Sequence, residues 1–220
     1  MIALFDFDGV IMDTESQYTR FWDETGRKYV NKDGFGLMIK GQTLKQIFEN
    51  HFAGRPEEEL REIENCINEF ERNMKYEFIK GAEEFLMKLK DTGIPVAIVT
   101  SSNNQKMSQV YKAHPHLLTL VDVILTSEDF SRSKPDPECF LKGMEVLGGK
   151  PDTTVVFEDS IHGLTAGRAA GAYVVGLATT NRSETIAPLC DIVIDDFTGF
   201  ELPTLPLRPL HPQAPCCERS

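Results

Sequence analysis

Short apolar runs recur along the chain, and longer amphipathic stretches separate them. The runs are rich in valine and isoleucine and are bounded by glycine, proline, aspartate or serine, as is typical of buried strands. The runs are Ile2–Phe7, Val96–Thr100, Val121–Thr126, Thr154–Phe157, Tyr173–Leu177 and Ile192–Ile194. Strands that alternate with helices of ordinary length predict an α/β fold in which helices cover both faces of a parallel sheet.

Helical periodicity fills several of the intervals between these runs. The stretch Gly81–Gly93 places its large apolar residues on one face and stops at a glycine. A similar pattern covers Pro137–Gly148. A third helical stretch begins after a candidate N-cap, Ser160, and stops at Gly171.

The interval between the first and second strands differs from the rest of the chain, because it shows helical periodicity and no convincing strand. Three of its segments have the pattern of amphipathic or acidic helices: TESQYTRFWDETGRKY, TLKQIFENHF and PEEELREIENCINEFERNMKYEF. A helical insertion is the simplest account. We therefore predict a core formed by residues 1–13 and 81–200 and an inserted helical cap formed by residues 14–80.

The last residues of the chain, 201–220, have a different composition. Prolines recur at every third residue from Pro203 to Pro215, which favours an extended polyproline conformation. We expect a solvated or loosely docked tail, and a partner-binding motif is the alternative.

Composition and charge exclude several classes of protein. The chain has 220 residues, of which 41% are hydrophobic and 26% are charged, as in an ordinary globular protein. Its net charge of −11 argues against binding to nucleic acid or to an anionic membrane. No apolar run reaches the length of about 18 residues that a membrane span needs, and the first residues lack a signal-peptide pattern. The 5 cysteines have no metal-ligand spacing, so we expect reduced thiols and a cytoplasmic location. We also expect a monomer.

Acidic pairs follow two of the predicted strands. Asp6 and Asp8 come at the end of the first strand, and Glu158 and Asp159 come at the end of the fourth. Ligands of open parallel sheets bind at the carboxyl ends of the strands. Carboxylates that converge there repel one another unless a cation lies among them, and oxygen ligands of this kind suit Mg²⁺. Turn formation or helix capping is the alternative, but capping explains at most one residue of the second pair.

Hydroxyl groups follow the second predicted strand, and a lysine follows the third. Thr100, Ser101 and Ser102 end the second strand, where hydroxyls and loop amides suit an oxyanion, although such residues also cap helices. Lys134 follows the third strand in the segment SRSKPDPECF, whose prolines stiffen the backbone. It offers the fixed positive charge that this acidic chain otherwise lacks.

Together these groups have a chemical logic. A carboxylate nucleophile can form an aspartyl-phosphate, and a second carboxylate can protonate the leaving oxygen and then activate water. A magnesium ion reduces the repulsion between nucleophile and phosphate. Lysine and hydroxyl donors stabilise the charge on the transferring phosphoryl group.

Four segments of the chain resemble, in order, the four motifs of the haloacid dehalogenase superfamily. The segments DFDGVIMDTE and EDSIHGLTAGRAAGA are similar to the β-phosphoglucomutase-like subgroup, whose small helical cap is inserted just after the first motif. The resemblance covers roughly residues 1–198. It implies a Rossmann-like three-layer parallel-sheet core with an inserted helical cap domain.

The resemblance also implies a role for each matching residue. Asp6 would be the nucleophile and Asp8 the general acid and base. Thr100 and the backbone of Ser101 would bind the phosphoryl group, and Lys134 would neutralise it. The ligands implied for Mg²⁺ are the Asp6 side chain, the Asp8 carbonyl, Asp159 and, directly or through water, Glu158.

The cap is expected to supply substrate contacts from the loop that carries the specificity of the subgroup. A plain connector between helices is the alternative for this loop. Tyr18 stands where the mutase has a cap histidine, and Leu44 stands where it has a cap arginine. Both departures weaken the mutase interpretation, although Lys40 or Lys45 would be able to supply the charge. The cap residues expected to bind substrate are Lys40, Gly41, Gln42, Thr43 and Lys45.

The sequence thus predicts a Mg²⁺-dependent phosphatase that hydrolyses a small phosphorylated metabolite, a sugar phosphate by preference, through an aspartyl-phosphate. A β-phosphoglucomutase-type phosphotransferase is the first alternative. A non-catalytic binding protein that uses the proline-rich tail is a remote one. The only partner expected is the small phosphorylated substrate, with no nucleic acid and no membrane.

Overall fold

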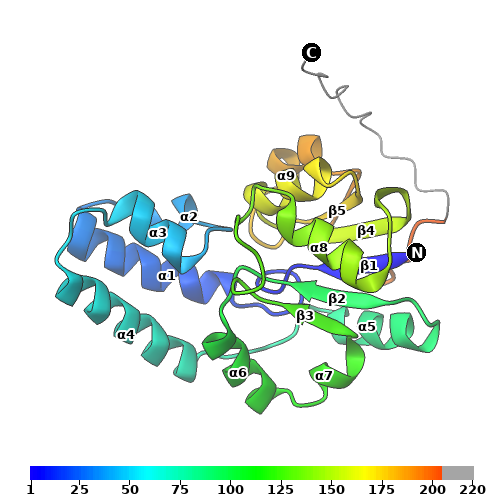
Figure 1. The fold of residues 1–220 in the computed structure, drawn as a ribbon, viewed down its shortest axis with the longest axis horizontal. Coiled ribbons are helices and arrows are strands. Elements are labelled where there is room, and N and C mark those ends of the chain that lie inside the picture. Colours follow the sequence, from blue (N-terminus) through cyan, green and yellow to red (C-terminus); the bar gives the residue numbers. More distant parts are fainter. Residues whose placement is uncertain (205–220) are drawn as a thin grey trace.

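The computed structural model describes residues 1–204 and contains a parallel sheet covered by helices on both faces (Figure 1). The strand order is β3-β2-β1-β4-β5-β6, and all neighbouring strands are parallel. This confirms the predicted α/β class. The strands are β1 Ile2–Phe5, β2 Val96–Val99, β3 Val123–Leu125, β4 Thr154–Glu158, β5 Tyr173–Leu177 and β6 Ile192–Ile194.

The order of the strands places the two acidic pairs side by side. The chain runs from β1 through β2 to β3 on one side and then returns to β4 on the other side. The sheet therefore has its topological switch point between β1 and β4, where open α/β sheets bind their ligands. Phe5 is in register with Phe157, so Asp6 and Glu158 leave the sheet next to each other.

Two hydrophobic clusters flank the sheet because alternate strand residues point to opposite faces. One cluster contains Phe5 and Phe157 and is covered by α5, α6 and α7. The other contains Leu4 and Val156 and is covered by α8, α9 and α10. Figure 1 shows α8 and α9 on one side of the sheet and α5 and α7 on the other. These helices are α5 Ala82–Asp91, α6 Asn104–Ala113, α7 Leu117–Leu120, α8 Glu138–Leu147, α9 Ile161–Ala169 and α10 Ser183–Ile186, with short 3₁₀ turns at Pro151–Thr153 and Ala187–Leu189.

Residues 14–80, which we call the cap, contain helices and pack around an apolar cluster that includes Trp22, Phe35, Ile47 and Ile67. In Figure 1 the cap helices extend beyond the ends of the strands. The exact division between core and cap stays a prediction. The cap elements are α1 Glu15–Thr25, a π-helix at Gly26–Val30, α2 Phe35–Met38, α3 Leu44–His51 and α4 Glu57–Asn73.

Element boundaries differ from the sequence-based expectations at several points. The first strand ends at Phe5 instead of Phe7, because the chain turns at Asp6–Gly9 to form the site. The last predicted cap helix stops at Asn73, and Phe78 instead forms an isolated antiparallel bridge with Met12. The proline-rich tail lies almost wholly outside the described residues. Within residues 1–204, no helix is both long enough and apolar enough to cross a membrane.

Candidate active site

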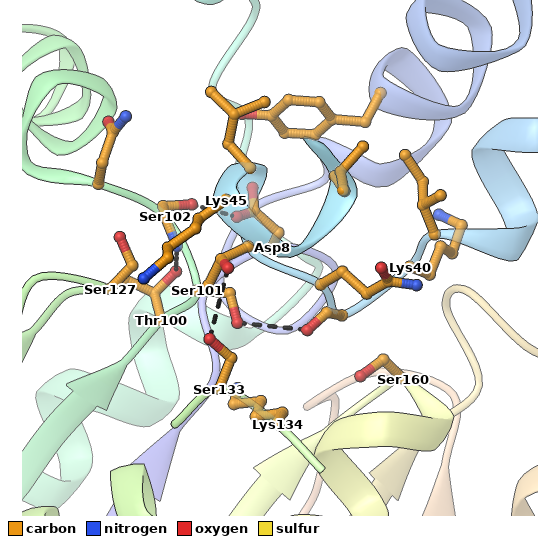
Figure 2. Close-up of a pocket in the computed structure, with 18 of the residues that line it drawn as sticks. Asp8, Lys40, Lys45, Thr100, Ser101, Ser102, Ser127, Ser133, Lys134 and Ser160 are labelled. Carbon is orange, nitrogen blue, oxygen red and sulfur yellow. Dashed lines mark hydrogen bonds between the residues drawn. The ribbon is translucent and has the colours of Figure 1, made fainter. Parts of the chain in front are cut away.

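A cavity of about 760 Å³ lies between the carboxyl ends of the strands and the cap. Figure 2 shows Asp8, Thr100, Ser101 and Lys134 on the core side of this cavity, with Lys40 on the cap side. Every residue for which the sequence predicted a catalytic, substrate-binding or metal-binding role lines it. These residues are Asp6, Asp8, Lys40, Gly41, Gln42, Thr43, Lys45, Thr100, Ser101, Ser102, Lys134, Glu158 and Asp159.

The turn after β1 places Asp6 at the centre of the site. The Asp6 amide donates to the carbonyl of Phe157 at 2.9 Å, which extends the β1–β4 pairing by one residue. The chain then turns at Gly9, whose φ is +75°. A Cβ atom at Gly9 would lie 2.2 Å from Oδ2 of Asp159, so only glycine permits this close approach.

Lys134 is buried between two carboxylates. Its Nζ atom donates to Oδ1 of Asp6 at 2.6 Å, to Oε1 of Glu158 at 2.7 Å and to the Val99 carbonyl at 3.2 Å. Burial by itself would lower the pKa of Lys134, but the charges of Asp6 and Glu158 outweigh burial and raise it. The lysine is therefore protonated at the point where the sheet binds its ligand.

Asp6 titrates far from its ordinary range. Burial raises the pKa of Asp6 to about 8, although Lys134 opposes the shift, and the neighbouring Glu158 and Asp8 add to it. Removal of the carboxylate from water disfavours its charged form, and nearby like charges do the same. An added cation would therefore stabilise the ionised carboxylate.

Glu158 and Asp159 have different surroundings. Oε2 of Glu158 accepts from the amides of Asp159 and Ser160, each at 2.9 Å, and from the Ser160 hydroxyl at 3.0 Å. Oδ2 of Asp159 is buried and has no hydrogen-bond partner among the described residues. Burial raises the pKa of Asp159 well above its ordinary value, and the charges of Glu15, Glu158 and Asp6 add to the effect.

These carboxylates fit a divalent cation. One oxygen each from Asp6, Glu158 and Asp159 lies within 4.8 Å of the others. An all-oxygen donor set with an unpartnered, buried Asp159 oxygen suits Mg²⁺. Glu158 already holds Lys134 and three donors, which favours contact through water over direct ligation. The predicted role of the Asp8 carbonyl stays a prediction.

Asp8 is held by a lysine that the sequence reasoning missed. The Lys106 ammonium contacts both carboxylate oxygens of Asp8, and the Ser102 hydroxyl donates to Oδ2 at 2.9 Å. The Lys106 side chain is only 2% exposed. Burial favours a higher pKa for Asp8, yet Lys106, Thr14 and Ser102 outweigh burial and hold it below its ordinary value. Lys134 is thus not the only fixed positive charge of the site.

One signal in the sequence pointed to Lys106. It occupies the first turn of α6, after the N-cap Asn103, whose side chain accepts from the Lys106 amide at 2.9 Å. A cation near a helix N-terminus opposes the helix dipole. An acidic partner, here Asp8, offsets this unfavourable interaction.

The loop after β2 offers donors to an anion. Oγ1 of Thr100 accepts from the Ser102 amide at 3.0 Å, which holds the turn together. The Ser101 hydroxyl donates to the Gly41 carbonyl of the cap at 3.4 Å (Figure 2). No described residue accepts from the Ser101 backbone amide, so this amide is available to a phosphoryl oxygen.

The cap loop contacts the core through its backbone. Gly41 has a φ of +78°, and the loop packs closely against Ser160 and His162 at this residue. A Cβ atom at Gly41 would lie 2.9 Å from the Ser160 hydroxyl. Nδ1 of His162 lies 2.8 Å from the Lys40 carbonyl. His162 therefore joins the helix after β4 to the cap loop.

The cap side chains differ in their freedom. Lys40 pairs with Glu15, which is also largely buried. Lys45 is 82% exposed and lies 3.9 Å from Glu49. Thr43 is the N-cap of α3 and forms a capping box with Gln46. Their predicted contacts with substrate stay predictions.

Tyr18 packs against the apolar cluster of the cap and also takes part in a polar contact. Its hydroxyl donates to Oε1 of Glu71 at 2.8 Å, and its ring lies 4.6 Å from the Lys106 ammonium. Glu71 is a buried carboxyl of α4 that also lines the cavity. Nothing local in the sequence marked it, because Tyr18 and Glu71 are 53 residues apart.

Carboxylates, hydroxyls and a buried lysine at one sheet edge, facing an inserted cap, are typical of enzymes that transfer phosphoryl groups through an aspartate. The comparisons with known proteins agree, and the chain is a phosphoester hydrolase or phosphotransferase. The family model for haloacid dehalogenase-like hydrolases matches residues 3–177, and the chain belongs to this family. This is the family that the sequence motifs indicated. Membership of a family of hydrolases argues against the alternative of a non-catalytic binding protein.

Individual relatives include a phosphatase and a mutase. The chain is 30% identical over 207 residues to a validoxylamine A 7'-phosphate phosphatase from Streptomyces hygroscopicus subsp. limoneus, and the match covers 92% of this chain and 96% of the relative. It is 27% identical over 232 residues to a β-phosphoglucomutase from Mycobacterium bovis, with 88% of each protein covered. A haloacid dehalogenase hydrolase of family IA, variant 3, from Entamoeba histolytica has a TM-score of 0.78 at 24% identity. That match covers 91% of this chain and 95% of the other, and it shows the shared fold.

Proposed function

We propose that this protein is a Mg²⁺-dependent phosphatase that hydrolyses a small phosphorylated metabolite, a sugar phosphate or related compound, through an aspartyl-phosphate. The observation that carries the proposal is the position of Lys134, buried between Asp6 and Glu158 at the floor of the cavity. The relative with 30% identity is named as a phosphatase of a small phosphorylated compound, which supports the same conclusion.

In the proposed reaction, Asp6 attacks phosphorus and the bond from phosphorus to the leaving oxygen breaks. Asp8 donates a proton to that oxygen, for which it must first bind a proton although Lys106 lowers its pKa, and the metabolite leaves as an alcohol. Ionised Asp8, the form favoured by Lys106, then takes a proton from water as the water attacks the aspartyl-phosphate. Inorganic phosphate leaves and Asp6 is regenerated.

The surrounding residues position and neutralise the phosphoryl group. Lys134 holds Asp6 in place and supplies a fixed positive charge, and the Ser101 amide is free to donate to a phosphoryl oxygen. Mg²⁺, held by Asp6 and Asp159 with Glu158 through water, would supply the charge that offsets repulsion between nucleophile and phosphate. The cap excludes water from the cavity when it covers the strand ends.

A β-phosphoglucomutase-type activity is the second candidate, because a named mutase is similar over most of the chain. A mutase must hold a bisphosphate and shield its aspartyl-phosphate from water. Lys40 is paired with Glu15, and Leu44 and Tyr18 stand where the mutase has basic residues, so the cap favours the hydrolase. Formation of glucose 6-phosphate from β-glucose 1-phosphate and a bisphosphate primer, without free phosphate, would favour the mutase.

The direct test of the proposal is Asp6→Asn. We expect this variant to release no phosphate from any substrate that the wild type hydrolyses, while it keeps the same circular dichroism spectrum. Asp13→Asn is a matched control, because Asp13 is an exposed aspartate just beyond the same turn. Phosphate release by Asp6→Asn at the wild-type rate contradicts the proposed mechanism.

A further inference from the structure

The cap contributes one wall of the cavity, and this wall combines apolar and acidic side chains. On α4, four residues at helical spacing face the cavity, so they form one stripe that runs along it. Aromatic and aliphatic side chains of α1 and α3 flank this stripe. We call the stripe the α4 face, and it consists of Glu64, Ile67, Asn68 and Glu71.

Glu71 is fixed in position but is incompletely paired. It is 7% exposed, and the Tyr18 hydroxyl donates to its Oε1 at 2.8 Å. The Tyr76 hydroxyl donates to the Glu71 backbone carbonyl at 2.8 Å, which anchors the end of the helix. Among the described residues, the bond from Tyr18 is the one hydrogen bond of the carboxyl group, and none is made to its other oxygen, Oε2. Burial raises the pKa of Glu71, while the charge of Lys106 and the hydrogen bond from Tyr18 oppose the shift. A carboxylate accepts about four hydrogen bonds, so a carboxyl group with a single side-chain donor has room for a donor from a ligand.

The apolar part of the wall lies beside this carboxyl group. Trp22, Ile47 and Phe48 line the same cavity from α1 and α3. Ligand sites of this kind bury carbon atoms against apolar side chains, while a few placed polar groups fix the orientation. The wall therefore fits a compound that carries hydroxyl or ammonium groups on a carbon frame.

The charges of the cavity also limit what the leaving group can carry. Lys40 is paired with Glu15, and Lys106 and Lys134 are paired with carboxylates of the core. Lys45 is mostly exposed and lies next to Glu49. No arginine lines the described cavity. A second phosphate group that reached the α4 face would meet its carboxylates, and Lys45 is the lysine of the described lining that is left to neutralise it.

We propose that Glu71 is a specificity-determining residue whose carboxylate accepts a hydrogen bond from a hydroxyl or ammonium group of the leaving group. The substrate class that follows is a monophosphate of a neutral or cationic polyhydroxylated compound, and bisphosphates are disfavoured. This inference rests on the proposed phosphatase function and deepens it. Tyr18 acts through Glu71 as a positioning residue.

The test measures kcat/KM for phosphate release from a panel of compounds. Glucose 6-phosphate, glucosamine 6-phosphate and glucitol 6-phosphate represent the proposed class, and fructose 1,6-bisphosphate carries a second phosphate. The compound p-nitrophenyl phosphate reports the core chemistry alone, because its leaving group has no hydroxyl or ammonium donor to offer Glu71. We expect the wild type to prefer at least one sugar monophosphate over the bisphosphate by about tenfold or more.

Three variants separate recognition from folding. Glu71→Gln should lower kcat/KM for the preferred monophosphate by about tenfold or more, and the loss should be largest if that compound is glucosamine 6-phosphate. The same variant should change kcat/KM for p-nitrophenyl phosphate by less than about twofold. Tyr18→Phe should lower kcat/KM for the same monophosphate by a smaller factor. It replaces Glu71→Gln as the test variant if Glu71→Gln does not fold. Glu69→Gln should change nothing, because Glu69 is an exposed residue of the same helix outside the cavity.

Several results would overturn the inference. Equal losses with p-nitrophenyl phosphate and the monophosphate would mean that Glu71 is only structural. Three other results would each exclude the proposed class. The first is unchanged monophosphate hydrolysis in Glu71→Gln, and the second is preferred hydrolysis of the bisphosphate. The third is hydrolysis of p-nitrophenyl phosphate but of none of the three monophosphates. Absence of all hydrolysis by the wild type, or full activity of Asp6→Asn, would instead contradict the phosphatase function on which the inference rests.

Discussion

Nζ of Lys134 lies 2.7 Å from Oε1 of Glu158, and the two side chains are 1% and 0% exposed. The same nitrogen is 2.6 Å from Oδ1 of Asp6. A single buried ammonium group thus joins the ends of β1 and β4 across the switch point of the sheet. Loss of this group leaves two buried carboxylates without their main counter-charge.

Lys134→Met should therefore impair both catalysis and stability. We expect kcat/KM to fall on the order of 100- to 1,000-fold, because a donor to the transferring charge is lost. In EDTA at neutral pH, the free energy of unfolding should fall by about 3–5 kcal/mol, the usual cost of breaking a buried ion pair. Phosphate release and urea unfolding measure the two effects. Lys112→Met is the control at an exposed lysine, and equal behaviour of the two variants would contradict the prediction.

The acidic cluster should make stability depend on pH in the absence of metal. The folded protein raises the pKa of Asp6 to about 8 and also raises that of Asp159, from an ordinary value of 3.8 for each. A carboxyl group with a raised pKa binds its proton more tightly in the folded state, so stability is lost as pH rises from about 4 to about 8. We expect urea unfolding in EDTA to show this loss and Mg²⁺ to reduce it.

Asp159→Asn isolates the contribution of one carboxyl group. In EDTA at pH 8 the variant should be more stable than the wild type, because the amide removes a buried negative charge that has no hydrogen-bond partner at Oδ2 among the described residues. The difference should disappear well below the ordinary pKa of 3.8, where Asp159 is protonated in both the folded and the unfolded state. Mg²⁺ should raise the melting temperature of the wild type more than that of the variant. A variant that is less stable at pH 8 in EDTA would show that the cluster is not under repulsion.

Lys106→Met should destabilise the protein because it leaves Asp8, whose side chain is only 14% exposed, without its lysine. The expected loss is about 3–5 kcal/mol at neutral pH. The folded pKa of Asp8 is depressed, so its contribution is present above the ordinary pKa of 3.8 and is lost as pH falls through the lower folded value. Urea unfolding at neutral and acid pH measures the difference, and Lys112→Met on the same helix is the control. A loss that does not shrink at acid pH would indicate a packing effect instead of charge pairing.

Gly163→Ala should disturb the site from the helix that supports it. A Cβ atom at Gly163 would lie 1.7 Å from Oε1 of Glu158, the oxygen that binds Lys134. Activity should fall by about tenfold or more, even though alanine favours a helix over glycine by roughly 0.5–1 kcal/mol. Gly167→Ala is the control one turn later, where the nearest atom would be 3.1 Å away. Equal activity of both variants would contradict the steric explanation.

Much of the core site was predictable because its residues follow strands. Asp6, Lys134 and Asp159 each come at the end of an apolar run or in the loop after it, and parallel strands bring their carboxyl ends to one edge. The hydroxyl loop after Thr100 follows the same rule. A local pattern, together with the direction of the strands, was enough to place these groups in one cavity.

Residues on the helices were harder to predict. Lys106 lies 98 residues from Asp8 in the sequence, and Glu71 lies 53 residues from Tyr18. Each sits on a helix whose periodicity indicates a buried face but does not say which element covers that face. The pairing partner of a buried charge is set by the packing of distant helices, which the spacing of residues along one helix does not contain.

The sequence by itself determined the α/β class, the helical insertion and the aspartates, lysine and acidic pair of the motifs, because strand and helix periodicity and turn residues are local properties. Only the tertiary structure decided which strands are neighbours, that Lys134 joins Asp6 to Glu158, that Lys106 pairs with Asp8, and that Glu71 lines the cavity. These relationships depend on the packing of elements far apart in the chain. Burial within that packing is also what shifts the pKa of each carboxyl group, since it removes the water that would otherwise screen their charges.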